Sequence, residues 1–328
     1  MISKADLTYE LPPEQIAQFP IQPRDAARLL VMERATGSLS ELSFSELPQA
    51  LGPDDLLVVN DTRVIPARLR GHKDSGGKAE ALLVERRPNG SWLALVRTGG
   101  HLRPGRVLHF GELEAKVERV RTDGTCELRL DREVLLEEVG EAPLPPYIRR
   151  DDSLESDLRD YQSVFARVPG AVAAPTASLH FTSELAARLP VAPLTLHVGP
   201  GTFRPIRSER LEEHRIDPEL FQVPASTAEA IAAARAAGGR VIAVGTTVVR
   251  ALETCGGNEA SGSTALFILP GHAFRAVDSL ITNFHLPGSS LLALVQAFGG
   301  VEATKRAYTY AIEKGFRFYS YGDAMWIR

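Results

Sequence analysis

Short apolar runs separated by strong turn signals fill the chain between residues 56 and 130. The run Leu-Leu-Val-Val at 56–59 ends in a polar turn at 60–63, and further short runs follow it. Gly- and Pro-containing turns at this spacing are typical of the strands of a small β-barrel. The pattern predicts strands near 79–85, 91–97, 106–110, 112–121 and 125–130.

After about residue 160, segments with helical and strand periodicity alternate. Such alternation is typical of βαβ units around a largely parallel sheet. Ser226 and Glu229 form a capping-box pattern that opens an alanine-rich helix, and Gly238 follows its end. Further strands are predicted at 194–198, 241–244, 265–269, 278–282 and 316–321, and helices at 183–189, 248–254, 289–298 and 302–314.

The two patterns predict two domains. A proline-rich stretch at 142–148 precedes an acidic run, and together they mark the exit from the barrel-like part. We predict an α/β fold with a mostly parallel sheet, formed by residues 1–60 and 150–328, and a smaller inserted β-barrel-like domain at 61–149. A chain of 328 residues is long enough for each part to bury its own core.

Positive charge is concentrated in the barrel-like part. The whole chain carries a net charge of −4, but residues 60–130 hold 14 Lys or Arg against 9 Asp or Glu, a balance of +5. Most cations are Arg, whose planar guanidinium suits phosphates and base edges. The distribution favours a nucleic-acid contact, with genome composition or heat tolerance as an equally simple explanation.

Cysteine content and hydropathy exclude several classes of protein. The two cysteines, Cys126 and Cys255, are far apart, so neither a zinc site nor a disulfide framework is predicted. No run of about 18 apolar residues occurs, and the N-terminus lacks the apolar core of a signal peptide. We expect a cytoplasmic protein without a membrane segment. No His, Asp and Glu group has ligand spacing, so no metal is expected.

Two loops of small residues carry candidate binding groups. The loop 170–181 ends in His180, and its small side chains let a ligand approach the backbone. A structural histidine in a packed connector is the alternative for His180. Further on, Gly199, Gly201 and Arg204 can surround an anion with backbone amides and a guanidinium, whereas a tight turn is the alternative.

Polar groups also follow two predicted strands. Gly245, Thr246 and Thr247 lie at a strand-to-helix junction, where free N–H groups and the helix dipole suit a carboxylate or phosphate. N-capping by threonine is the alternative, and the absence of a following lysine excludes a Walker-type loop. Asn283 and His285 can read a base or move a proton, or else bond to a turn. Aromatic and acidic side chains accompany them at Phe284, Tyr319, Tyr321 and Asp323. Because ligands bind beyond the carboxyl ends of strands in open α/β sheets, we expect one shared cleft.

Nine blocks along essentially the whole chain resemble one known family, the S-adenosylmethionine:tRNA ribosyltransferase-isomerases of queuosine biosynthesis. They are YELPPEQIAQFP (9–20), VVNDTRVIPARLRG (58–71), PLPPYI (143–148), YQSVFA (161–166), GAVAAPTASLHFT (170–182), TLHVGPGTFRP (195–205), VIAVGTTVVRALE (241–253), LITNFHLPGSSLL (280–292) and RFYSYGDAM (317–325). Ser178 stands where the family pattern usually has glycine, which narrows the loop before His180. The stretch 254–264 is short, which indicates a trimmed surface connection.

The resemblance implies a transfer of the ribosyl part of S-adenosylmethionine to 7-aminomethyl-7-deazaguanine in the anticodon of a tRNA. The sugar is rearranged on transfer, so the product is epoxyqueuosine, and adenine and methionine leave. S-adenosylmethionine is then a consumed cosubstrate and not a methyl donor.

Such a reaction needs at least two proton-transfer groups, because a sulfonium acidifies the adjacent ribose carbon and departing adenine needs a proton. We assign His180 and His285 to this role, with Asp61 and Asp323 as alternatives whose pKa burial would have to raise. The methionine carboxylate is expected at the junction 245–247. The cosubstrate-binding candidates are Gly199, Gly201, Arg204, Gly245, Thr246, Thr247 and Asn283. Phosphate contacts are expected from Arg63, Arg68, Arg70, Arg97 and Arg103, and base stacking from Phe284, Tyr319 and Tyr321.

Two functions of other classes stay open. A non-catalytic tRNA-binding protein would bind through its basic part and use the α/β part as a scaffold. An S-adenosylmethionine-dependent RNA methyltransferase would release S-adenosylhomocysteine, but the chain has no strand followed by a glycine-rich E/D-x-G-x-G loop. We expect a monomer, because no coiled coil or long apolar edge is evident.

Overall fold

The computed structural model describes residues 4–150, 154–203, 206 and 210–328. The chain forms two compact units. The larger unit extends through Arg63 and includes Pro146–Arg149 and Asp160–Arg328, and the smaller comprises Val64–Pro145 with Arg150–Arg159. Residues 146–149, predicted within the inserted domain, thus belong to the larger unit, where the Tyr147 ring packs 4.8 Å from that of Tyr319.

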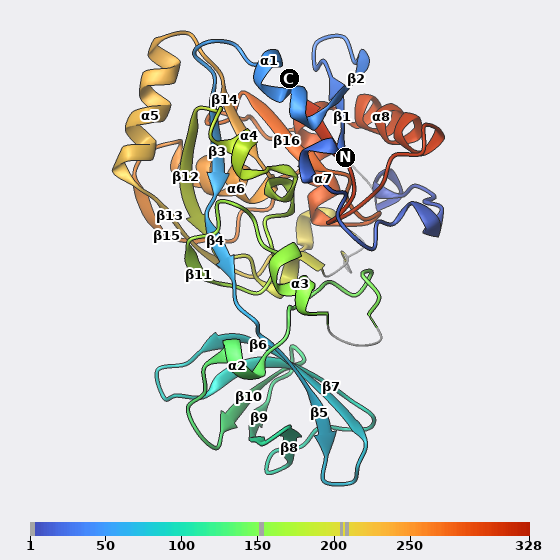
Figure 1. The fold of residues 1–328 in the computed structure, drawn as a ribbon, viewed down its shortest axis with the longest axis vertical. Helices are drawn as coiled ribbons and strands as arrows, with labels where there is room; N and C mark the ends of the chain where they lie inside the picture. The colour runs from blue at the N-terminus through green and yellow to red at the C-terminus, as the bar shows by residue number, and fades with distance from the viewer. Residues whose placement is uncertain (1–3, 151–153, 204–205, 207–209) are drawn as a thin grey trace. The chain divides into compact units, whose positions relative to one another are not determined.

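A nine-stranded sheet forms the larger unit, in the order β15-β13-β12-β3-β14-β16-β17-β1-β2 (Figure 1). Its strands are β1 (Arg28–Met32), β2 (Leu39–Ser43), β3 (Leu56–Asn60), β12 (Val191–Leu196), β13 (Glu219–Val223), β14 (Val241–Val244), β15 (Ala260–Thr264), β16 (Ser279–Asn283) and β17 (Ala324–Ile327). The neighbours β12, β3, β14 and β16 run parallel, as do β17 and β1, whereas the pairs at both edges and β16–β17 are antiparallel. The α/β class is confirmed, and the sheet is mixed because antiparallel pairs complete both edges.

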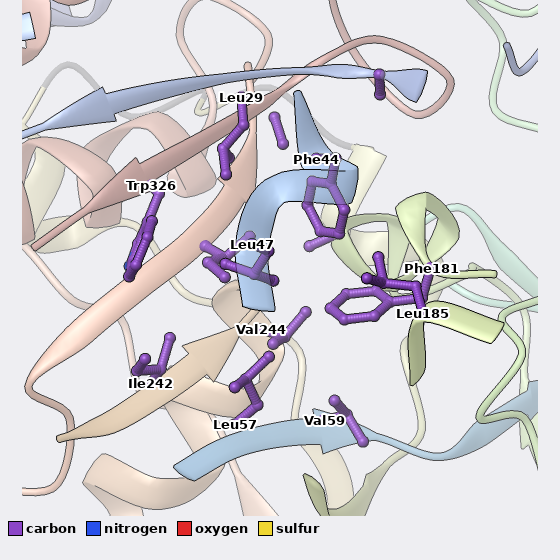
Figure 2. Close-up of a cluster of buried hydrophobic side chains, with 14 of the residues drawn as sticks. Leu29, Phe44, Leu47, Leu57, Val59, Phe181, Leu185, Ile242, Val244 and Trp326 are labelled. Atoms are coloured by element: carbon purple, nitrogen blue, oxygen red, sulfur yellow. The ribbon is translucent and has the colours of Figure 1, made fainter. Parts of the chain in front are cut away.

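The centre of this sheet is buried on both faces. Every residue of β3, β14 and β16 is buried, and continuous apolar runs are typical of parallel strands that are covered on both sides. On one face, Leu57, Ile242 and Trp326 pack with Phe44 and Phe181 from connecting segments (Figure 2). The core therefore fixes the central strands, so the loops that follow their carboxyl ends are attached to a rigid sheet.

Helices follow the strands much as the periodicity predicts. They are α1 (Leu47–Ala50), α2 (Leu136–Val139), α3 (Glu155–Asp160), α4 (Ser183–Ala186), α5 (Ala225–Ala236), α6 (Thr246–Cys255), α7 (Ser290–Gly299) and α8 (Val301–Glu313). The predicted capping box at Ser226 is wrong, because α5 begins at Ala225 after Pro224 and has no side-chain cap. Among the described residues, no helix has the length and apolarity needed to cross a membrane.

Two strand predictions near the C-terminus are wrong. The apolar segment 265–269 is irregular, and the strand β15 lies just before it, where a small-residue segment pairs with β13 at the sheet edge. The segment 316–321 forms a loop whose Phe316 and Phe318 rings are fully buried. The final strand is β17, which inserts between β16 and β1. In both places pairing with a distant strand outweighs local apolar character.

The smaller unit contains a closed barrel of six antiparallel strands in the order β10-β7-β6-β5-β8-β9. They are β5 (Arg68–Lys73), β6 (Lys78–Arg86), β7 (Trp92–Thr98), β8 (Val107–Phe110), β9 (Leu113–Val120) and β10 (Thr125–Leu130). In β9, Leu113, Ala115 and Val117 are buried and alternate with exposed charged residues, as a barrel wall requires. The predicted barrel is confirmed.

A separate two-stranded sheet pairs β4 (Thr62–Val64) with β11 (Val168–Ala171).

Candidate functional site

A pocket of about 650 Å³, its part open to solvent included, lies in the larger unit at the carboxyl ends of β14 and β16. These two strands are parallel neighbours, so the loops that follow them meet at the same edge of the sheet (Figure 1). The loop 173–177 and the side chains of Tyr147 and Tyr319 complete the wall. Ligands of open α/β sheets bind at this position.

The start of helix α6 forms one wall of the pocket. Gly245 is the N-cap residue and has φ +99°, a conformation that favours glycine. No side chain caps the helix. The N-capping alternative for Thr246 and Thr247 is therefore wrong. Both threonines are buried and line the pocket. The first-turn N–H groups have no intrahelical acceptor and carry the positive end of the helix dipole, so this wall suits an anion.

Asn60 holds that helix start in place, a role that the sequence alone did not indicate. It is fully buried at the end of β3, and its Nδ2 donates to Thr247 Oγ1 at 3.3 Å and to the Leu196 carbonyl at 2.9 Å. Its Oδ1 accepts from the backbone N–H of Leu196 at 3.0 Å and of Thr62 at 3.1 Å. The amide therefore ties β3 to β12 and to α6. The sequence offers one signal for this role, because Asn60 is a polar residue that directly follows the apolar run 56–59.

His285 lines the pocket and is 8% exposed. Burial lowers its pKa to about 3, so the imidazole is neutral near pH 7. Its Nε2 lies 2.7 Å from Thr282 Oγ1. Two tyrosines hold its backbone: Tyr9 OH donates to its carbonyl, and its N–H donates to Tyr308 OH at 3.0 Å. A neutral imidazole has one nitrogen lone pair that can take a proton.

Asn283 lines the same pocket and connects it to His180. Its Nδ2 donates to the Tyr319 carbonyl at 2.9 Å and to His180 Nε2 at 3.3 Å. Because an amide nitrogen only donates, His180 Nε2 accepts. Asn283 is 2% exposed, and its Oδ1 has no hydrogen-bond partner among the described residues. This buried acceptor is ready for a donor on a bound ligand.

His180 stands behind Asn283 and does not line the pocket. It borders a smaller cavity, about 210 Å³ with its part open to solvent included, together with Arg24 and Arg317. Burial, and then the positive charges of Arg317 and Arg24, lower its pKa to about 3. Its ring packs 5.0 Å from the Phe44 ring. Of the two predicted acid–base histidines, His180 thus contacts Asn283, and His285 is the one in the pocket wall.

Two of the aromatic candidates, Phe284 and Tyr319, are part of the pocket lining, and Tyr321 is not. Tyr319 lines the pocket at φ +71°, and Asn283 together with the backbone of Phe284 holds it there. Backbone strain in a non-glycine residue clusters at functional sites. The Phe284 ring is fully buried and packs against the rings of Phe316 and Phe318, which favours a structural role, and its part in base stacking stays a prediction. Tyr321 borders the smaller cavity beside His180.

The two carboxylate candidates lie in buried hydrogen-bond networks. Asp61 accepts from Thr195 Oγ1 at 2.6 Å and from Arg167 at 2.8 Å. Asp323 accepts from the backbone N–H of Arg317 at 2.7 Å and of Arg28 at 3.0 Å, and so joins the C-terminal loop to β1. Neither carboxylate is part of the pocket wall. Their arrangement favours a structural role, and their part in proton transfer stays a prediction.

The glycine-rich turn after β12 offers little to an anion in its described part. The Gly199 N–H donates to Glu219 Oε1 at 2.8 Å, and a Cβ on Gly201 would lie 3.2 Å from Asp217 Oδ2. The Gly199 amide is thus already used by Glu219, which also pairs with the buried Arg250, so this N–H is not free for an anion. Arg204 lies outside the described residues.

Ser178 carries a buried hydroxyl in the 3₁₀ helix Thr176–His180. The residue is fully buried, and its Oγ has no hydrogen-bond partner in the described ranges. An unsatisfied buried hydroxyl destabilises a fold, so Ser178→Ala is expected to raise the free energy of unfolding by about 1 kcal/mol. Urea denaturation measures it. Ser163→Ala is the matched control, because Ser163 Oγ accepts from the Phe165 N–H at 3.1 Å and its loss lowers stability. Equal changes in both variants would contradict the prediction.

No group of three or more His, Cys, Asp or Glu side chains able to hold a metal ion occurs among the described residues. Cys126 and Cys255 are both free thiols.

Comparison with known proteins places the chain in one family. A family model described as queuosine biosynthesis protein matches residues 4–327. The chain is 50% identical over 338 residues to an S-adenosylmethionine:tRNA ribosyltransferase-isomerase of Anaeromyxobacter dehalogenans (strain 2CP-C), and 49% identical over 340 residues to that of Moorella thermoacetica, with 98% of each chain covered in both comparisons. A crystal structure of an S-adenosylmethionine tRNA ribosyltransferase from Thermotoga maritima is 36% identical, with a TM-score of 0.56 over 98% of this chain and 100% of that one. The chain therefore belongs to the queuosine biosynthesis protein family.

Proposed function

We propose that this protein transfers and isomerises the ribosyl moiety of S-adenosylmethionine onto 7-aminomethyl-7-deazaguanine in the anticodon of a tRNA, with release of adenine and methionine. Family membership supports the reaction class, because relatives that are about 50% identical over 98% of their length are named S-adenosylmethionine:tRNA ribosyltransferase-isomerase. The pocket wall carries the proposal structurally: it combines the N-terminus of α6, the unpartnered Asn283 Oδ1 and the neutral imidazole of His285.

S-adenosylmethionine fits this wall by charge and by hydrogen bonding. The first turn of α6 would hold the methionine carboxylate, since Thr246 and Thr247 offer N–H groups and hydroxyls at the positive end of the helix dipole. Asn283 Oδ1 accepts a hydrogen bond, so it would orient a donor such as an amino group of the cosubstrate or of the modified base. Tyr319 offers a ring for stacking.

His285 would move the proton. The positive sulfonium acidifies the adjacent ribose carbon, and a neutral imidazole in the wall takes a proton from that position. Because burial lowers its pKa to about 3, the neutral ring is a weak base, so the proton has to come from a carbon that the sulfonium makes acidic, and the protonated ring then gives the proton up readily to the departing adenine. His180 would act through Asn283, which it contacts, and not on the reacting atoms.

Product analysis tests the reaction. The purified chain is incubated with S-adenosylmethionine and a tRNA that carries 7-aminomethyl-7-deazaguanine, and the digested tRNA and the small molecules are analysed by mass spectrometry. Epoxyqueuosine with equal amounts of free adenine and methionine is the expected result. Intact cosubstrate beside retained tRNA binding would support a non-catalytic tRNA-binding protein, and S-adenosylhomocysteine would indicate a methyltransferase.

The α6 start gives a prediction for cosubstrate affinity. The double substitution Thr246→Ala, Thr247→Ala removes two hydroxyls from the wall and the Asn60 contact, and it is expected to weaken S-adenosylmethionine binding by about tenfold. Isothermal titration calorimetry measures the dissociation constant. Thr254→Ala, at the opposite end of α6, serves as the control because Thr254 is not in the pocket wall. Unchanged affinity in the double variant would show that the methionine carboxylate does not bind at the start of α6.

We propose that the barrel unit contacts the tRNA backbone. Arg68 and Arg70 pair with Glu80 at 2.6 Å and with Glu141 at 3.1 Å, so part of the predicted phosphate-binding charge is compensated locally. Arg97 and Arg103 are exposed, and neither forms an ion pair within the described part of the chain. These two arginines are therefore the stronger candidates for phosphate contacts.

Salt dependence measures those contacts. The double variant Arg97→Gln, Arg103→Gln is expected to reduce the slope of log K against log salt for tRNA binding by about two, because each phosphate contact releases about one counterion. Arg129→Gln is the matched control, since Arg129 pairs with Glu118 on the same barrel. A slope that is the same in the double variant and in the wild type would exclude these arginines from the interface.

We further propose that the protein works as a cytoplasmic monomer without a metal. Two free cysteines are compatible with a reducing compartment. Light scattering on the purified chain gives its mass in solution, and turnover in the presence of a chelator tests the independence from metal.

A further inference from the structure

A second pocket lies in the larger unit between α7, α8 and the N-terminal segment. It measures about 950 Å³ with its open part included, and residues 6–10 form one side of it. On α8, Thr304, Tyr308 and Ile312 are spaced by one turn and face it together. It shares no residue with the pocket at the ends of β14 and β16.

Two buried polar atoms in its wall have no partner. Gln296 is 2% exposed and Thr304 is fully buried, and neither Gln296 Oε1 nor Thr304 Oγ1 forms a hydrogen bond with any described residue. The orientation of the Gln296 amide is fixed, because its Nε2 donates to the Asp6 carbonyl at 2.7 Å. Its Oε1 is therefore an acceptor only, and no described donor reaches it.

The charges at the mouth favour a cation. Asp6 and Glu302 compensate the ammonium of Lys305, at 2.9 and 3.5 Å. Glu10 and Glu313 also line the pocket, and both are exposed. Neither of these two side chains forms an ion pair or hydrogen bond within the ranges that the structure describes. Glu10 and Glu313 thus give the mouth of the pocket uncompensated negative charge. Deeper in the wall, Gln296 Oε1 and Thr304 Oγ1 have no hydrogen-bond partner among the described residues.

We propose that this pocket binds a small aliphatic amine in its protonated form. An alkylammonium supplies up to three N–H donors for Gln296 Oε1 and Thr304 Oγ1, and it satisfies the carboxylates of the mouth. Its alkyl part would contact Leu292 and Ile312, which also line the pocket. The site does not depend on the proposed transferase activity.

Calorimetric titration of the full chain with 1,4-diaminobutane tests the site. Saturable binding of one diamine per chain is expected, with butane-1,4-diol and succinate at least about tenfold weaker because they lack the ammonium. Raising the salt concentration is expected to weaken the diamine. No saturable binding, or a diol that binds as well as the diamine, would overturn the proposal.

Variants locate the bound diamine. Glu10→Gln with Glu313→Gln removes the charge of the mouth at two exposed positions and is expected to weaken binding about fivefold or more. Glu14→Gln with Glu229→Gln is the control, because both residues are exposed acids away from this pocket. Thr304→Val removes a buried hydroxyl without changing the shape of the wall, and it is also expected to weaken the diamine. Equal binding by the mouth variant and the control, or full binding by Thr304→Val, would refute the assignment.

Discussion

Replacing His285 by glutamine is expected to lower the rate of ribosyl transfer by about two to four orders of magnitude. Its imidazole lies in the pocket wall and is neutral, so it is the described side chain there that is best suited to take a proton. Glutamine keeps a polar side chain of similar reach but takes up no proton. Single-turnover release of adenine from labelled S-adenosylmethionine, with saturating tRNA, measures the step.

His180→Gln is the matched control for this prediction. Glutamine can still accept the hydrogen bond from Asn283 Nδ2, so a loss of no more than about tenfold is expected. A loss as large as that of His285→Gln would make His180 a proton-transfer residue as well. Near-normal turnover in both variants would show that neither histidine transfers the proton, and Asp61 and Asp323 would then be the candidates.

Lowering the pH from about 7.5 to about 5 is expected to cost the larger unit about 4 kcal/mol of unfolding free energy through His180 and His285 alone. Both pKa values are near 3 in the folded protein, against 6.5 ordinarily, because burial disfavours the charged ring. Between these values the unfolded chain binds the proton and the folded chain does not. Stability is therefore complete above about pH 6.5 and is lost as the pH falls toward 3.

Urea denaturation at the two pH values measures this loss. In a Trp92→Phe background the fluorescence comes from Trp326, which is buried in the large sheet, so the transition of the larger unit is observed. His180→Gln and His285→Gln are each expected to reduce the difference between the two pH values by about 2 kcal/mol. Phe44→Leu, a buried change beside His180 without a titrating group, lowers stability equally at both values. An undiminished pH dependence in the His→Gln double variant would rule out this origin.

The strands that carry the site were predictable, but the site itself was only partly so. The apolar run of β14, the apolar centre of β16 and the polar residues at the ends of both strands indicate where the loops meet. Gly245, Thr246, Thr247, Asn283 and His285 indeed share one pocket. The small residues of the loop 170–181 predict His180 in the same cleft, yet the fold places it behind Asn283.

The sequence by itself determined those features that depend on neighbours in the chain. Turn residues at close spacing produced the barrel hairpins, and continuous apolar runs produced the central parallel strands, because pleat and helix periodicity are local properties. Tertiary structure decided the insertion of β17 between β16 and β1, the packing of Tyr147 on Tyr319, and the contact of Asn283 with a histidine 103 positions away. Each of these rests on surfaces brought together by long-range packing, and local periodicity carries no information about which distant surface a buried side chain will meet.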